Sequence, residues 1–189
     1  FWLVRWVDEV RGFDGVLAAA RAWGERRGET GDERPFFLLL HTYQVHDYYI
    51  YDPPLDDEVH GAPGMSARFA GRLSVHPSGL VTASQGDLDA FRALYQGRVR
   101  AVEARFPELE RWVTAPAGED VVWVITADHG EGFDAAKGRV HHGGRLHDDL
   151  LRVPLLLRAR GRVPEGRVIE DTIRSVDVLP TPLDLLGVP

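Results

Sequence analysis

The sequence predicts an α/β domain in which a mostly parallel sheet is flanked by helices. Short apolar runs at 35–40, 121–126 and 153–157 are typical of strands buried on both faces. Segments with helical spacing separate these runs, and such alternation favours a parallel sheet. With 189 residues, the chain is long enough for one domain of this kind with a sizeable core.

Composition narrows the classes of function. Hydrophobic residues make up 44% of the chain and charged residues 27%, as in ordinary globular domains. No apolar run approaches the roughly 18 residues that a membrane span needs. The net charge of −7 and the lack of a basic stripe argue against a nucleic-acid partner. The absence of cysteine excludes disulfides, thiolate metal sites and a cysteine nucleophile within this segment, and it leaves the compartment unknown.

The first half of the chain predicts one helix and one strand. Residues 7–27 carry apolar side chains at helical spacing, which predicts a helix with one buried face. A polar loop over 28–34 leads into the strand at 35–40, whose continuous apolar run predicts burial on both faces. An aromatic loop containing His and Asp follows over 41–54.

The second half predicts a surface excursion, two further strands and two helices. Residues 55–86 are rich in Gly, Pro, Ser and Asp and predict a long surface segment. Apolar positions three or four apart predict a helix over 86–106. The β-branched run 121–126 predicts a strand, followed by a Gly- and His-rich loop over 130–144 and a turn of helix within 146–151. A strand at 153–157 and a helix over 177–186, stopped by Gly187, complete the prediction.

Polar residues of metal-binding or anion-binding types follow two of the predicted strands. In open α/β sheets, ligands bind at the carboxyl ends of the strands. Six of the eight histidines fall in these two segments. The first segment contributes His41, His46 and Asp47; the second contributes Asp128, His129 and Glu131, followed by Lys137, His141, His142 and His147.

The Asp128-His129-Gly130 segment has the chemistry of a cation site. The carboxylate and the neutral imidazole can both bind a divalent ion, and Gly130 lets the chain turn so that adjacent side chains converge. The alternative is a strand-end aspartate that caps the next segment beside an exposed histidine, which is the more frequent context of so short a motif.

The remaining candidates are groups that can contact an anion. His46 can donate a hydrogen bond to a tetrahedral anion or act as a general acid, and His141, His142 and Lys137 can supply cationic contacts to the same anion. The alternative for each is a solvated side chain in a surface loop.

Two strings of residues resemble the sulfatase family of the alkaline phosphatase superfamily. They are the strand and motif over 122–131, Val-Trp-Val-Ile-Thr-Ala-Asp-His-Gly-Glu, and the segment over 142–155 that ends in Arg-Val-Pro-Leu. The family form is a hydrophobic strand with Ser/Ala-Asp-His-Gly-Glu, then His-Gly-x-x-Leu-Tyr-Asp-Glu and an Arg-Val-Pro strand. The strand at 35–41 with His46-Asp47 and the tail at 176–189 also match in order.

The resemblance implies a fold, a reaction and roles for residues. The fold would be alkaline-phosphatase-like and incomplete at its N-terminus, with 1–189 as the C-terminal part of the catalytic domain. Asp128 and His129 would hold a divalent metal, commonly calcium, with manganese or magnesium as alternatives. His46 and His142 would contact a small-molecule or carbohydrate sulfate ester, and Lys137 would assist.

The sequence departs from the family pattern at several points. The family's paired Asp ligands and its Cys-x-Pro-Ser-Arg motif, whose Cys becomes formylglycine, lie upstream of the matched segments. This sequence contains neither, so we expect this segment alone to be inactive. Gln44-Val45 replaces the usual Asp-Pro before the loop histidine, and His147 replaces the usual Tyr.

Other functions remain open at this level. Phosphonate or phosphodiester hydrolases and phosphoglycerol transferases of the same superfamily share the Asp-His-Gly segment. A binding module that kept the fold and lost the chemistry is the alternative from a different class. The nucleophile and the affinity for a divalent cation would distinguish these functions.

Overall fold

The computed structural model describes residues 3–8, 12–46, 48, 85–118, 120–137, 139–142 and 146–188. The described residues form a mixed α/β structure, as predicted. In chain order the elements are β1 (Leu3–Asp8), α1 (Gly12–Thr30), β2 (Phe37–Thr42), α4 (Gln85–Ala117), β3 (Val122–Thr126), β4 (Gly132–Asp134), β5 (Arg139–His141), α5 (Asp148–Leu151), β6 (Leu155–Ala159), the 3-10 helix η2 (Ser175–Asp177) and α6 (Pro180–Leu185). The predicted surface excursion lies outside the described residues except for 85 and 86, which begin α4.

A parallel pair of strands joined by α1 forms the N-terminal unit. β1 pairs with β2 in register from Leu3 opposite Phe37 to Asp8 opposite Thr42. The predicted helix start at residue 7 is therefore wrong, because residues 3–8 form a strand and α1 begins at Gly12. The apolar stripe of α1 is buried as predicted, with Val16 and Ala20 almost fully enclosed.

The core lies between α1, α4 and the strands. Leu109 and Val113 of α4 pack into the buried face of α1, and side chains of β2 and β3 close the cluster from the other side. α4 extends well beyond the predicted end at Phe106, because the segment after Pro107 carries these two buried residues.

β3 and β6 form an antiparallel pair, from Val122 opposite Ala159 to Thr126 opposite Leu155. The prediction of a mostly parallel sheet is therefore not confirmed by the described strands, of which only β1 and β2 pair in parallel. An apolar run indicates that a strand is buried but not its direction. β6 runs back along β3 because the intervening 28 residues contain a hairpin and the short α5 rather than a long crossover helix.

The hairpin of β4 and β5 lies inside the segment predicted as a loop. Gly132 stands opposite His141 and Asp134 opposite Arg139. At the C-terminus, the predicted single helix over 177–186 is divided into η2 and α6, which begins at Pro180.

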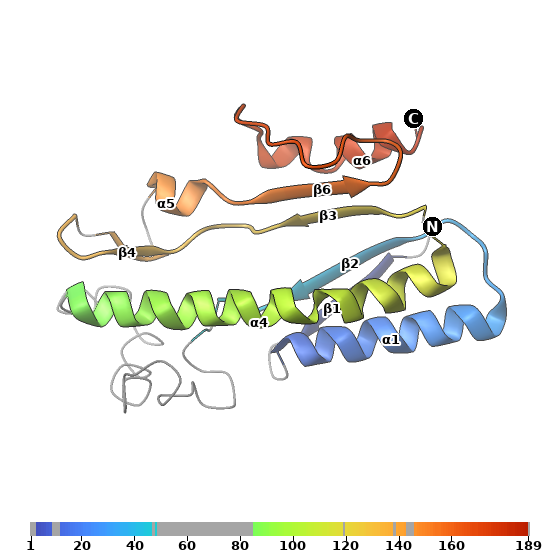
Figure 1. Ribbon diagram of the computed structural model, residues 1–189, viewed down its shortest axis with the longest axis horizontal. Helices are drawn as coiled ribbons and strands as arrows, with labels where there is room; N and C mark the ends of the chain where they lie inside the picture. Colours follow the sequence, from blue (N-terminus) through green and yellow to red (C-terminus); the bar gives the residue numbers. More distant parts are fainter. Residues whose placement is uncertain are drawn as a thin grey trace.

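The helices lie on two sides of the β3–β6 pair. Figure 1 shows α1 and α4 side by side below the β3–β6 pair, with β6 and α6 above β3. β4 and α5 lie together at the end of the structure where β3 ends. Among the helices of the described residues, none combines the length and apolarity that a membrane span requires.

Candidate functional site

Three histidines from separate segments meet where β2 and β3 end. The ring centroid of His142 lies 4.6 Å from that of His46 and 4.5 Å from that of His129. The rings of His129 and His142 are nearly parallel, with an angle of 28° between their planes. The rings of His46 and His129 are 5.8 Å apart. We call these three residues the histidine cluster. His46 and His142 were predicted to contact an anion and His129 to bind a metal, and the structure places all three together.

Two hydrogen bonds of Gln44 hold the loop after β2 in place. The Gln44 backbone N–H donates to the Thr42 hydroxyl at 3.1 Å. The Gln44 side-chain oxygen accepts from the Phe13 N–H at 2.9 Å, which satisfies a free donor in the first turn of α1. The residue that departs from the family pattern therefore anchors the loop that carries His46. The ring of Tyr43 contacts His46 edge-on, with the centroids 5.3 Å apart.

The backbone after β3 orients Asp128 and His129. The Asp128 carboxylate accepts the His129 N–H at 3.0 Å. The His129 Nδ1 lies 2.9 Å from the Gly130 carbonyl oxygen, which can only accept, so Nδ1 is the nitrogen that carries a proton in this contact. That Nε2 is 3.9 Å from an Asp128 oxygen. Asp128 is 82% exposed, so its carboxylate remains accessible to a ligand.

Gly130 is the point of closest backbone approach at the site. Its N–H donates to the Leu150 carbonyl at 2.8 Å, which ties the Asp-His-Gly turn to α5. A Cβ at this position would lie 2.0 Å from the Asp149 carbonyl oxygen. A side chain cannot be accommodated there without moving α5, so the glycine is required by packing.

A buried carboxylate stands behind the histidine cluster. Glu131 Oε2 lies 2.8 Å from Nδ1 of His142, and the side chains are 4% and 19% exposed. The sequence placed Glu131 among the polar residues after the strand but gave it no role, because its partner is eleven residues away in the hairpin. Burial raises the pKa of Tyr95, and the negative charge of Glu131 adds to the increase.

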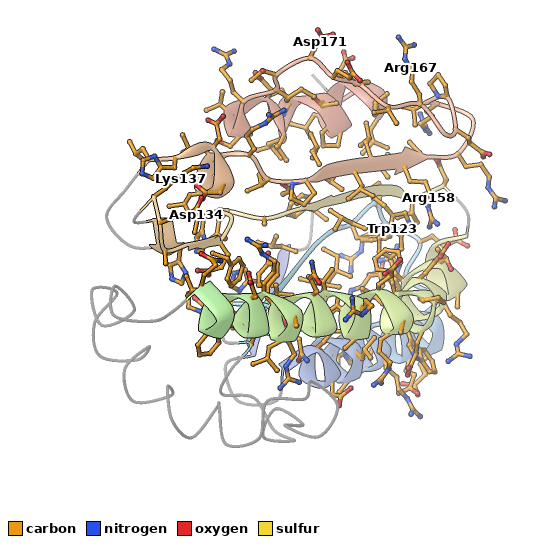
Figure 2. All side chains as sticks on the ribbon, turned by 60° about the vertical axis from the view of Figure 1, so that its left-hand side comes forward. Trp123, Asp134, Lys137, Arg158, Arg167 and Asp171 are labelled. Carbon is orange, nitrogen blue, oxygen red and sulfur yellow. The ribbon has the colours of Figure 1, made fainter. Side chains whose placement is uncertain are left out.

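The other predicted contacts do not join the cluster in the described structure. Nζ of Lys137 lies 3.4 Å from Asp134 at the turn of the hairpin, and Figure 2 shows the two side chains together there. The backbone of His141 belongs to β5, and its side chain lies outside the described residues. His41 packs edge-on against Tyr43, and its buried Nδ1 has no hydrogen-bond partner among the described residues. Asp47 lies outside the described residues.

The three imidazoles of the histidine cluster suit some divalent cations better than others. Donor nitrogens of the histidine cluster lie within 4.8 Å of one another, close enough to share one ion after small side-chain movements. Imidazole nitrogens suit zinc and related transition metals, whereas calcium takes six to eight oxygen ligands. The described residues at the cluster therefore fit a cation that accepts imidazole, and they do not by themselves form a calcium shell.

The sequence matches the family described as Sulfatase over residues 25–188, which includes both strand ends and the whole histidine cluster. No curated protein and no solved structure matches the chain.

Proposed function

The chain belongs to the sulfatase family, and on that premise we propose that it carries part of the active site of a metal-dependent hydrolase of sulfate esters. The observation that carries the proposal is the convergence of His46, His129 and His142 from three segments at one end of the strands. Family membership makes hydrolysis the expected chemistry, and the cluster supplies groups suited to a tetrahedral anion.

In this proposal His46 and His142 contact the oxygens of the ester. Each ring presents nitrogen donors, and a preorganised donor stabilises the charge that develops on a transferring group. One of the two, His46 by its position in the loop after β2, passes a proton to the leaving oxygen. Lys137 and His141 are proposed as further cationic contacts, since the hairpin that carries them leads directly to His142.

We also propose that Asp128 and His129 bind a divalent cation. Their closest donor atoms are 3.9 Å apart, and the carboxylate is largely exposed. A bound cation would offset negative charge on the substrate. Calcium, manganese and magnesium are the ions that the family resemblance suggests. The imidazole in the pair adds zinc to the ions that deserve testing.

The proposal is tested by activity of the full-length protein on a panel of aryl esters. We expect 4-nitrophenyl sulfate to be hydrolysed faster than bis(4-nitrophenyl) phosphate or a phenylphosphonate monoester at equal concentration. EDTA should abolish the activity, and one of the four cations should restore it. His142→Ala should lower kcat/KM by a factor of about 100 or more, in line with the loss of a transition-state donor.

The control for His142→Ala is Arg167→Ala, which also removes a side chain with nitrogen donors. Arg167 is exposed on the side of the molecule away from the hairpin (Figure 2), and we expect its loss to leave activity unchanged. Preferred hydrolysis of the phosphodiester or phosphonate would overturn the sulfate assignment. Retained cation binding without turnover of any ester would overturn the enzymatic proposal and favour a binding module.

A further inference from the structure

The carboxylate behind the histidine cluster has a geometry that the proposed reaction does not yet explain. A carboxylate taken out of water costs several kcal/mol unless it is paired or hydrogen-bonded. The Glu131 side chain is 4% exposed and lies 2.8 Å from His142. A glutamate enclosed to this extent beside a candidate catalytic ring calls for a physical role.

We propose that Glu131 is the positioning residue of His142, an inference that rests on the proposed function. The Nδ1–H of His142 donates a hydrogen bond to Oε2 of Glu131, so the proton is held on that nitrogen and the ring is fixed in orientation. Nε2 is then the atom left to face the histidine cluster, and it can donate to an ester oxygen when the ring is doubly protonated, a form whose positive charge the Glu131 carboxylate offsets. Carboxylates behind histidines act in this way in metal sites and in catalytic triads.

The surroundings of Glu131 keep this hydrogen bond in place. The chain at Gly130 is tied to α5 by its hydrogen bond to Leu150 and by close packing on Asp149, which fixes the backbone next to Glu131. On the hairpin side, Phe133 is buried and its ring packs on Tyr95, with the centroids 5.7 Å apart.

The ring of His129 is oriented in a similar way, by a hydrogen bond at Nδ1. Its Nδ1 is bonded to a backbone carbonyl, as the Nδ1 of His142 is bonded to a carboxylate. Both rings thus direct Nε2 away from their fixed partners, and they stack at 4.5 Å. Among the described contacts, the Nδ1 of His129 is held by the backbone and that of His142 by a side chain, so a single substitution can release the ring of His142.

The first test determines by ¹⁵N NMR which ring nitrogen of His142 carries the proton in the full-length protein. We expect the wild type to carry the proton on Nδ1, and Glu131→Ala to shift the population toward Nε2–H. Glu131→Gln keeps an acceptor oxygen and should retain Nδ1–H. This readout needs no turnover, so it separates this inference from the proposed function. An unchanged tautomer in Glu131→Ala would overturn the inference.

The second test is a double-substitution cycle in the full-length protein. Loss of a positioning partner of this kind costs about 10- to 100-fold, so we expect that decrease in kcat/KM for Glu131→Ala and a smaller one for Glu131→Gln. In the background of His142→Ala, Glu131→Ala should cause no further loss. An equal loss in both backgrounds would show a merely structural role and overturn the inference.

A matched control guards against loss of folding. Glu165→Ala removes a carboxylate from an exposed loop, and we expect it to change neither the tautomer nor kcat/KM. If Glu131→Ala unfolds, Glu131→Gln still tests the inference, because its side chain fills the same volume. Loss of Nδ1–H in Glu131→Gln, with the native near-ultraviolet circular dichroism retained, would overturn the inference.

Discussion

Replacing Gly130 by alanine should destabilise the fold and disturb the site together. The new Cβ would lie 2.0 Å from the Asp149 carbonyl oxygen and 3.3 Å from the Leu150 Cα. Backbone atoms must move to relieve this overlap, and overpacking of this kind costs about 1–3 kcal/mol. The movement also breaks the 2.8 Å hydrogen bond from Gly130 to Leu150, which contributes about 1 kcal/mol. The expected loss in the free energy of unfolding is about 2–4 kcal/mol.

The assay is urea denaturation followed by tryptophan fluorescence, with thermal melting alongside. For a chain of this length the expected loss lowers Tm by roughly 4 to 16 °C. Gly28→Ala is the matched control, since no atom lies within 4 Å of its Cβ and it sits in α1. Helix propensity predicts that this control gains up to about 1 kcal/mol. Stability of Gly130→Ala within about 0.5 kcal/mol of wild type would refute the close approach of α5.

Three further substitutions test the cation site and two titrating groups. Asp128→Ala should abolish divalent-cation binding by isothermal titration calorimetry, while Asp171→Ala, on an exposed surface away from the hairpin (Figure 2), should not. Hydrogen bonds from Arg34 hold the pKa of Asp32 far below its usual 3.8, so its stabilisation is full above that value and is lost as pH falls below it. Asp32→Asn should therefore flatten the acid side of the stability profile in urea titrations, and an unchanged profile would contradict this. Glu131→Gln should lower the raised pKa of Tyr95, followed by phenolate absorbance, because burial remains but the negative charge is gone.

Much of the fold was predictable because the apolar residues on a buried face recur at regular spacing in the sequence. The stripe of α1 and the apolar run of β3 were recognised from spacing alone, and both are confirmed with shifts of a few residues at their ends. β1 was missed because Arg5 and Asp8 interrupt its apolar residues, and its pairing with β2 depends on a partner more than thirty residues away. Sequence periodicity does not record which strand pairs with which.

The end of α4 shows tertiary burial outweighing a local signal. Pro107 predicts a helix boundary, and proline inside a helix costs about 3 kcal/mol. Beyond it, Leu109 and Val113 are 4% and 2% exposed against α1. Burying two such side chains contributes about 1.5–3 kcal/mol each, enough to offset the proline. The sequence alone did not reveal that α1 would provide the surface for them.

The sequence predicted which residues belong to the candidate site better than it predicted how they are arranged. His46, His129 and His142 were identified from their positions after strands, and the structure brings them together. The pairing of Glu131 with His142 was not predicted, because it depends on the hairpin that the Gly-rich segment concealed. Lys137 was predicted as an anion contact, whereas the structure pairs it with Asp134.

α4 fixes the spacing between two buried clusters. Near its start, Leu88, Phe91 and Leu94 are buried, and the ring of Phe91 contacts Tyr48, which in turn contacts Phe133. Near its end, residues 109 and 113 are buried against α1, and 33 residues span about 50 Å.

Each residue of an α-helix advances the facing direction by about 100°. Inserting or deleting a single residue between the two clusters would therefore turn one of them toward solvent. A change of about seven residues, two full turns, would keep both faces in phase. Length variation in this helix among relatives should accordingly come in whole turns.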